Sequence, residues 1–431
     1  MVKFITFGKI NNQYKYILIY ISIRIVNDYI FSEIFPKQIR PNFFYSKNYP
    51  PSILVQTFFN YLGSFIFSII LYLYEKFESK KEKKDGNKTQ RDSVKKYKLI
   101  YKNKNFPFLK LKTIIITTSL SIIVVEILNI SYIVGFMGLL YWVFDIFFVS
   151  YINLLMFDMP IYSHKKCAII FMVAFSFLFK LLSTIEFITN DKYNLFYKNH
   201  IILIPILIIF YICLSLIRFY SICKIKWLLD YRFISVKIFY IIYNLLGTII
   251  LLIACLIADY IKCVDKKTIN DIDLICLVKI ETGKTIEYYF DNFSYYFEHL
   301  WKKDINTWMN IFYLFLFILQ LLLNALRILY IILIIRHLSP EFYLCTYDIY
   351  YIIIRTIGLI NAIINNGDVL IEVYNVLTEL GALVGILIYL ELIELNFWNL
   401  NRNLKKNIIT RSEIEYNIND IETEAEELEI S

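Results

Sequence analysis

Long apolar runs alternate with short charged segments along most of this chain, and few folds accommodate such a pattern. A helix needs about 20 mostly apolar residues to cross a bilayer. Runs of this kind predict an all-α, polytopic membrane protein with about ten transmembrane helices. The helices are expected at 14–34, 52–74, 112–131, 133–157, 164–188, 200–222, 233–261, 307–336, 340–366 and 370–396.

The composition agrees with this interpretation. Hydrophobic residues make up 58% of the chain and charged residues 19%, whereas soluble globular chains are about 45–50% apolar and about 25% charged. The net charge of +8 comes largely from one loop beside the membrane, so the expected partner is the lipid bilayer and not a nucleic acid. The seven cysteines form no CxxC pair, so neither a metal site nor a cofactor is expected.

The distribution of basic residues predicts the orientation, because cytosolic segments of membrane proteins carry an excess of Lys and Arg. With an even number of spans, the basic loop 75–111, the amino-terminal segment 1–13 and the tail 397–431 all fall on one side. We expect that side to be cytosolic. The tail is rich in Asp and Glu and lacks apolar runs, which predicts a solvated segment.

The loop 262–306 falls on the opposite, lumenal side. It carries Cys263 and Cys276, which would share an oxidising compartment and either form a disulfide or remain two free thiols. Asn292 begins an Asn-x-Ser tripeptide, which is an acceptor for glycosylation.

Four stretches have a recognisable order of helices, basic turns and glycines. The stretch 133–175 has a helix, a short basic turn and a second helix, and in 215–249 a helix ends in a basic segment before a helix with Gly247 near its middle. The stretch 337–355 starts a helix with Ser-Pro, and 379–397 contains Gly381, Gly385, Tyr389 and Glu391. In this order they resemble the fourth and fifth helices, the sixth-to-seventh connection, the turn into the ninth helix and the tenth helix of the drug/metabolite transporter superfamily. That superfamily includes EamA-like and nucleotide-sugar-transporter-like carriers.

The resemblance implies two five-helix halves, 14–188 and 200–396, with the second inverted in the membrane because five is an odd number. It implies a secondary transporter that moves a small organic solute, anionic metabolites included, across an internal membrane by alternating access. The Golgi, the endoplasmic reticulum, the vacuole and the plasma membrane all remain open, and so does a homodimer. Gly381 and Gly385 are four residues apart, which favours close helix packing over a hinge.

Ionisable residues inside spans are candidates for the solute site, because a charge in the bilayer is costly and usually functional. Arg24, Lys180 and Arg355 would hold an anionic solute, since a guanidinium matches phosphate or carboxylate geometry. Asp145 and Asp348 would pair with these cations or take part in proton coupling. The alternative is that all of these charges form internal salt bridges, which hold the helices in register.

Polar residues repeat at one spacing on two neighbouring helices. Asp348 and Arg355 are seven residues apart, so they lie on nearly the same helix face. Gln320 and Arg327 repeat this spacing on the preceding helix, with Asn324 between them. Arg327 therefore joins the candidate substrate-binding residues, and the two faces would line one polar path.

Two other functions compete with transport. A multi-pass receptor or scaffold would act through its loop and its acidic tail, and its mid-span charges would pair off. A membrane enzyme is disfavoured, because the four His lie near expected interfaces or in loops and no HExxH, GxSxG, Walker A or GxGxxG pattern occurs. We therefore expect no enzymatic activity.

Overall fold

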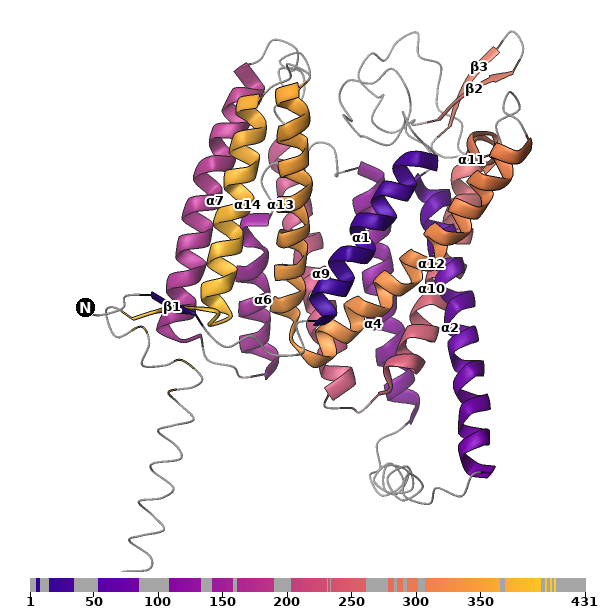
Figure 1. Cartoon of the computed structure of the whole chain (residues 1–431), viewed down its shortest axis with the longest axis horizontal. Coiled ribbons are helices and arrows are strands. Elements are labelled where there is room, and N and C mark those ends of the chain that lie inside the picture. Colours follow the sequence, from indigo (N-terminus) through magenta and orange to yellow (C-terminus); the bar gives the residue numbers. More distant parts are fainter. Residues whose placement is uncertain are drawn as a thin grey trace, which may run out of the picture. The chain divides into compact units, whose positions relative to one another are not determined.

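Figure 1 shows the chain as a computed structural model, and nearly all of the structure that it describes is helical. Eleven helices lie within the described residues, and all but one of them have 16 or more residues. The described residues are 5–7, 15–34, 53–84, 108–132, 142–157, 161–189, 203–230, 232, 234–260, 278–282, 285–289, 293–300, 307–364, 369–396, 400, 404 and 407.

The helices occur close to the apolar runs from which they are expected. Two pairs of short strands accompany them: β1 (Ile5–Phe7) pairs antiparallel with β4 (Ile393–Leu395), and β2 (Val278–Thr282) pairs antiparallel with β3 (Thr285–Tyr289). The helices are α1 (Lys15–Ile34), α2 (Ile53–Lys84), α4 (Phe108–Tyr132), α6 (Trp142–Phe157), α7 (Ser163–Thr189), α9 (Leu203–Asp230), α10 (Val236–Tyr260), α11 (Phe293–Leu300), α12 (Thr307–His337), α13 (Pro340–Ile364) and α14 (Val369–Tyr389).

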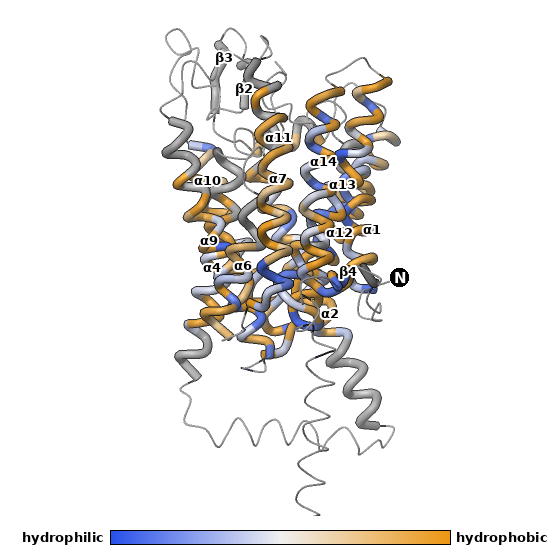
Figure 2. The backbone as a smooth tube through the Cα atoms, turned by 90° about the vertical axis from the view of Figure 1, so that its left-hand side faces the viewer, coloured by the Kyte–Doolittle hydropathy of each residue, from blue (hydrophilic) through white to orange (hydrophobic). Residues whose placement is uncertain are grey.

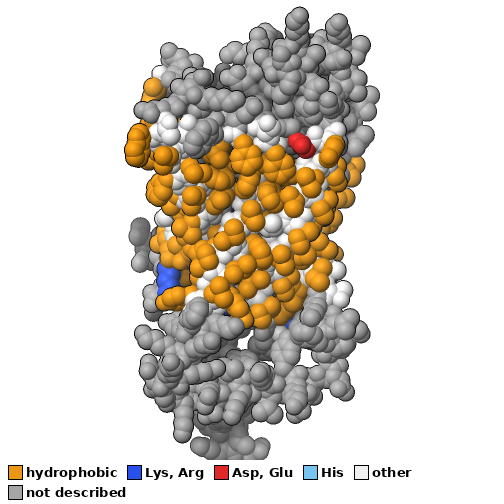
Figure 3. All heavy atoms as spheres, turned by 90° about the vertical axis from the view of Figure 1, so that its right-hand side faces the viewer, with side chains coloured by type: hydrophobic (Ala, Val, Ile, Leu, Met, Phe, Trp, Pro, Cys, Tyr) orange, Lys and Arg blue, Asp and Glu red, His pale blue; other side chains and the backbone are white. Residues whose placement is uncertain are grey.

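Five of the described helical segments are long and apolar enough to cross a membrane. Figure 2 shows that the helices are mainly hydrophobic along their lengths. Figure 3 shows an extended apolar surface on the side of the molecule that carries α2, α10 and α12. Such a surface is expected where helices face lipid, so the chain has the character of a multi-pass membrane protein. The five segments are Leu54–Tyr74, Val236–Tyr260, Thr307–His337, Pro340–Ile364 and Val369–Tyr389.

The chain packs as two compact units, each assembled from separate parts of the sequence. Unit 1 comprises Met1–Lys15, Leu140–Asn190 and Glu341–Ser431, and unit 2 comprises Tyr16–Leu139 and Asp191–Pro340. Unit 1 therefore contains α6, α7, α13 and α14, whereas unit 2 contains α1, α2, α4, α9, α10 and α12. Each unit takes helices from both expected five-helix halves.

Unit 2 is built around α2, which packs against both α10 and α12. In addition, α4 packs against α9 and α10. Two glycines let the central helices approach closely: a Cβ at Gly63 would press on Leu321 of α12, and a Cβ at Gly247 of α10 would collide with the ring of Tyr61. The absence of a side chain at these two positions is therefore what the packing requires.

Unit 1 is held together by α7 and α14, which lie side by side and run in opposite directions. A Cβ at Gly385 would press on Met172, and a Cβ at Gly381 would collide with the ring of Phe175. Met172 therefore meets Gly385 and the later residue Phe175 meets the earlier residue Gly381, as expected for two antiparallel helices. Both glycines thus serve close packing, in agreement with their spacing.

Three helix ends differ from the expected ones. Helix α2 continues to Lys84, into the expected basic loop, and α9 continues to Asp230. Long basic side chains do not stop a helix, because Lys and Arg have good helix propensity. Helix α14 ends earlier than expected, at Tyr389, and residues 393–395 form strand β4 instead.

The end of α14 is a Schellman motif. The Leu392 amide donates to the Leu387 carbonyl across 2.9 Å, and the Glu391 amide donates to the Ile388 carbonyl across 3.0 Å. Glu391 adopts a left-handed conformation with φ of 60°. Glycine is the usual residue at this position, so the sequence carries no obvious stop signal here.

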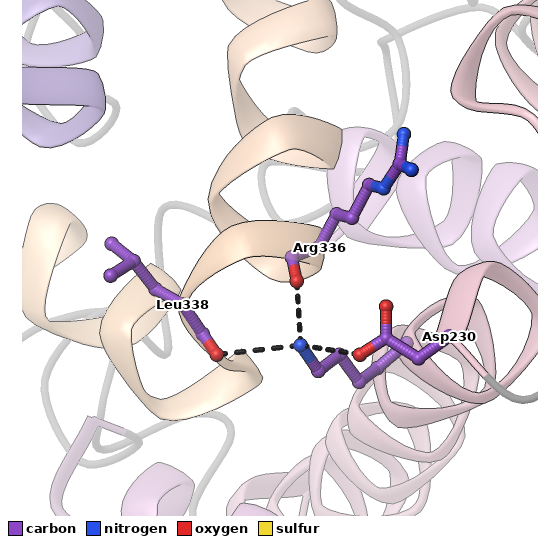
Figure 4. A network of polar contacts seen from close by, with 4 residues as sticks. Asp230, Arg336 and Leu338 are labelled. Atoms are coloured by element: carbon purple, nitrogen blue, oxygen red, sulfur yellow. Dashed lines mark hydrogen bonds and ion pairs between the residues drawn. The ribbon is translucent and has the colours of Figure 1, made fainter. Parts of the chain in front are cut away.

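A lysine side chain caps the carboxyl end of α12. Lys226 Nζ of α9 donates to the Arg336 carbonyl across 2.6 Å and lies 3.4 Å from the Leu338 carbonyl (Figure 4). The same ammonium group forms an ion pair with Asp230 at 2.7 Å. A cation is favourable at a helix carboxyl end, where the last carbonyls lack partners within the helix.

Local structure also occurs within the expected lumenal loop 262–306. It contains the β2–β3 hairpin and the short helix α11. Tyr296 of α11 is buried and stacks on Phe59 of α2, with ring centroids 5.5 Å apart. This aromatic contact packs α11 against α2 within unit 2.

Candidate functional site

Three pairs of polar residues from three helices of unit 2 form the candidate site, and we call them the amide cluster. In each pair the two residues are four positions apart, so both project from the same face of their helix. Each pair lies within a segment that is long and apolar enough to cross a membrane. The cluster consists of Asn60 and Ser64 on α2, Tyr240 and Asn244 on α10, and Gln320 and Asn324 on α12.

One link of the cluster joins α12 to α2. Asn324 Nδ2 donates to Asn60 Oδ1 across 2.9 Å and to the Gln320 carbonyl across 3.2 Å. Both amide hydrogens of Asn324 are therefore used. The close approach of the two helices at Gly63 brings these side chains within reach of each other.

A second link joins α10 to its neighbours. The Tyr240 hydroxyl donates to the Ala325 carbonyl across 2.7 Å, and it also interacts with the side chains of Ser64 and Asn244. Asn244 Nδ2 donates to the Tyr240 carbonyl across 2.9 Å, and the Ser64 hydroxyl donates to the Asn60 carbonyl across 2.7 Å. These donors of the cluster are thus committed to protein acceptors.

Two acceptors of the cluster have no donor among the residues that the structure describes. They are Gln320 Oε1 and Asn244 Oδ1, and the two residues are only 1% and 0% exposed. A buried acceptor without a donor costs about 1–3 kcal/mol. Buried acceptors are usually paired, so these two atoms make the cluster a candidate site.

Two tyrosines flank the cluster on α2 and α10. The hydroxyls of Tyr61 and Tyr243 are 2.5 Å apart, and both side chains are buried. The Tyr61 ring occupies the space that a side chain at position 247 would need. Packing and hydrogen bonding therefore hold α2 and α10 in a fixed register beside the cluster.

Two of the predicted substrate-binding residues, Arg24 and Arg327, also belong to unit 2. Arg24 is buried, and its Nη1 donates to the Tyr20 hydroxyl across 3.4 Å. Arg327 is half-buried, and its Nε makes no hydrogen bond within the described part of the chain. The ring of Tyr16 stacks on that of His337 at 5.2 Å, so α1 begins beside the end of α12. Measured along the helix axes, Arg24 lies about 12 Å from Tyr16 and Arg327 lies about 15 Å from His337.

The other predicted candidates belong to unit 1. Arg355 Nη1 of α13 lies 3.9 Å from Glu372 Oε2 of α14, and the side chains are 34% and 28% exposed. This ion pair is the kind of internal salt bridge that the alternative interpretation expects. Asp348 is buried on the same helix. The side chains of Asp145 in α6 and Lys180 in α7 lie outside the described residues.

Unit 1 also contains polar contacts outside the predicted substrate-binding residues. The Asn153 side-chain amide of α6 donates to Glu341 Oε1 at the start of α13, and both residues are buried. At the start of α7, His164 Nε2 lies 3.2 Å from Glu391 Oε1. The Lys165 ammonium lies 4.8 Å from the centre of the Tyr389 ring. These contacts tie helices together and do not converge with Arg355.

The predicted features of the loop 262–306 cannot be located. Cys263, Cys276 and Asn292 lie outside the described residues, and so does most of the tail 397–431. Within the described part, four cysteines are not disulfide-bonded, and no group of three or more His, Cys, Asp and Glu side chains forms a potential metal site. These cysteines are Cys167, Cys213, Cys223 and Cys255.

Sequence reasoning identified the α12 part of the amide cluster and missed the rest. Gln320 and Asn324 stood out by their spacing from Arg327, whereas the pairs on α2 and α10 contain no charge. The chain has 36 Tyr, so a single Tyr in a span carries little information. The usable signal is the recurrence of polar pairs four residues apart inside three apolar helices.

Comparison with known proteins adds no identification. No family model matches the sequence, and no curated protein matches it. The resemblance to the drug/metabolite transporter superfamily therefore rests on the residues quoted for it, and the function must be argued from the arrangement of the helices and the amide cluster.

Proposed function

We propose that this protein is a secondary transporter of the drug/metabolite type, with ten transmembrane helices in two inverted five-helix halves. It moves a small organic solute across an endomembrane or the plasma membrane by alternating access. In such carriers the two repeats enclose a binding site near the bilayer midplane. The observation that carries the proposal is a correspondence between the helix contacts of the two halves.

The correspondence appears when each helix of 14–188 is exchanged for its counterpart in 200–396. The counterparts are α1 and α9, α2 and α10, α4 and α12, α6 and α13, and α7 and α14. Within unit 2 this exchange converts the contact of α2 with α12 into that of α10 with α4, and the contact of α2 with α4 into that of α10 with α12. It converts the contact of α1 with α12 into that of α9 with α4. Within unit 1 it converts the contact of α6 with α7 into that of α13 with α14.

Two further contacts join a helix to its own counterpart. A two-fold axis produces such contacts, because an element that lies beside the axis meets its symmetry mate there. One is α2 with α10, and the other is α7 with α14. Phe175 and Gly381 meet across the second contact, and each lies twelve residues after the first residue of its helix. The antiparallel course of α7 and α14 supports inversion, because an axis along the membrane normal would make counterparts parallel.

The pairing of β1 with β4 supports an even number of spans. Residues Ile5–Phe7 precede the first helix, and Ile393–Leu395 follow the last one. Two segments that share a β-ladder lie on the same side of a membrane. This agrees with the cytosolic position expected for both chain ends from the basic residues.

The amide cluster is the proposed solute site. It lies inside membrane-spanning segments of unit 2 and combines α2 of the first half with α10 and α12 of the second. That position agrees with a midplane site between inverted repeats. Arg24 and Arg327 belong to the same unit and would hold an anionic group of the solute, since guanidinium groups bind carboxylate and phosphate well.

The proposal is tested by transport in proteoliposomes. The full-length protein is reconstituted and offered labelled nucleotide sugars, organic phosphates and amino acids. We expect saturable uptake of one of these classes, accelerated by the same solute inside the vesicles, because alternating access couples the two directions. The variant Gln320→Leu with Asn324→Leu should lower uptake about tenfold or more, since each buried polar contact contributes about 1–3 kcal/mol.

A matched control is Ser221→Ala. Ser221 Oγ lies 2.6 Å from Ser121 Oγ of α4 in the same unit, and neither serine belongs to the amide cluster. This variant removes an interhelical hydrogen bond but leaves the cluster intact, so it should keep wild-type uptake. Equal losses in the two variants, or uptake that does not respond to solute inside the vesicles, would contradict the proposed site and mechanism.

A further inference from the structure

The amide cluster offers a bound group more acceptors than donors. Asn324 Nδ2, Asn244 Nδ2 and the Tyr240 hydroxyl all donate to protein oxygens. Gln320 Oε1 remains without a donor among the described residues, and so does the Asn244 side-chain oxygen. Both atoms are buried inside spanning helices, where lipid supplies no donor.

The chemistry of these atoms selects the class of ligand. An anion would need free donors, whereas the buried side-chain atoms of the cluster that lack a partner within the described residues are both acceptors. Sites for Ca²⁺ and Mg²⁺ include carboxylates, and none of the six residues of the cluster is acidic. Neutral oxygens that replace part of a hydration shell are suited to a monovalent cation.

We propose that the amide cluster binds a monovalent cation, either an alkali ion or the ammonium group of a solute. The proposed ligands are Gln320 Oε1 and Asn244 Oδ1, which accept no hydrogen bond from the described residues. The Tyr240 hydroxyl lies beside the Ser64 and Asn244 side chains and donates to the Ala325 carbonyl. This binding goes beyond the proposed transport and does not depend on it.

Arg327 limits the charge that the site tolerates. It lies seven residues from Gln320 on α12, which is about 10 Å along the helix and on nearly the same face. Its guanidinium repels a bound cation, and the repulsion would double for a divalent ion. Removal of this charge should therefore tighten the binding of a monovalent cation.

Thermal unfolding of the full-length protein in detergent tests the proposal. The reference salt is N-methyl-D-glucamine chloride, which is replaced at constant ionic strength by sodium, potassium or methylammonium chloride. A ligand that binds only the folded state raises Tm with its concentration. We expect a rise in at least one of the three salts. A response to sodium or potassium identifies an alkali ion, and a response to methylammonium alone identifies an ammonium group.

Variants connect the response to the named atoms. Gln320→Leu with Asn244→Leu should weaken the apparent cation affinity by about tenfold or more. In the reference salt this variant should melt no lower than the wild type, because two acceptors without donors have been removed. Gln320→Glu and Arg327→Gln should both bind the cation more tightly, and Ser221→Ala should respond like the wild type.

Two results would overturn the cation site. One is an identical Tm of the wild-type protein in all four salts. The other is a salt response that persists unchanged in the Gln320→Leu and Asn244→Leu variant. Because unfolding needs no transport, a failure to detect solute uptake would count against the transporter and leave this result intact.

Discussion

At the scale of single residues, two glycines inside apolar helices have different surroundings. A Cβ built at Gly247 of α10 collides with the ring of Tyr61, which is itself held by Tyr243. A Cβ built at Gly358 of α13 lies 3.5 Å from Glu372 Oε2, an ordinary contact. Sequence alone does not distinguish these positions, because both are single glycines in a helical run.

Substitution by alanine should separate the two glycines. Gly247→Ala should destabilise the protein by about 1–3 kcal/mol, because the tightly packed ring cannot yield without strain. Gly358→Ala should be neutral or stabilising by up to about 1 kcal/mol, because alanine has the higher helix propensity. Thermal unfolding of both variants in detergent checks this, and an equal loss of Tm in the two would refute the packing explanation.

Single residues also explain why the sequence pointed to charges while the structure gathers neutral polar groups. Arg355 was a candidate because it is a cation within a span, yet it lies against Glu372 in an ion pair. Asn60 and Asn244 carry no charge and were not singled out. Whether such a residue meets a partner or faces lipid depends on the rotation of its helix. Tertiary packing sets that rotation, and hydropathy does not encode it.

At the scale of elements, apolar runs predicted helix positions well and helix ends less well. The start of α12 at Thr307 agrees with expectation, because the apolar run begins there. The end of α14 does not, because Glu391 takes the left-handed position that usually requires glycine. That conformation is sustained by the surrounding contacts, including the one between Glu391 and His164. Such contacts cannot be recognised in one stretch of sequence.

The cap on α12 gives a prediction at this scale. Lys226→Met removes the donor to the Arg336 and Leu338 carbonyls together with the ion pair to Asp230. The end of α12 should lose about 1–2 kcal/mol of local stability, since a charge-assisted hydrogen bond and a favourable dipole interaction are lost. Hydrogen exchange of the last turn of α12 should become faster.

Lys224→Met is the matched control for the cap. Lys224 lies on the same helix, but among the described residues its ammonium contacts only the Tyr220 side chain of its own helix, at 3.5 Å to the hydroxyl. The same change of residue type there should leave exchange at the end of α12 unaltered. If both variants accelerated exchange equally, the effect would come from lost charge and not from the cap.

At the scale of the whole molecule, the sequence predicted the helical membrane class but not the grouping of helices. Hydropathy divides the chain into consecutive runs, and the expected halves follow that order. The compact units instead combine α6 and α7 with α13 and α14, about 200 residues away in sequence. Contacts over such distances depend on which faces match, as with Gly381 and Phe175. The proposed inversion reconciles both views, because each unit then contains corresponding helices of the two halves.

The proposed even number of spans makes a prediction about the two chain ends. Thr6 of β1 is the ladder partner of Glu394 of β4, and directly paired residues in an antiparallel ladder have Cα atoms about 4.5–5.5 Å apart. A disulfide needs about 4.4–6.8 Å. In a background without native cysteines, Thr6→Cys with Glu394→Cys should therefore cross-link when isolated membranes are oxidised. Thr6→Cys with Lys279→Cys should not, because Lys279 belongs to the hairpin in the expected lumenal loop. A cross-link of the second pair without the first would put the ends on opposite sides of the membrane, which two inverted five-helix halves do not allow.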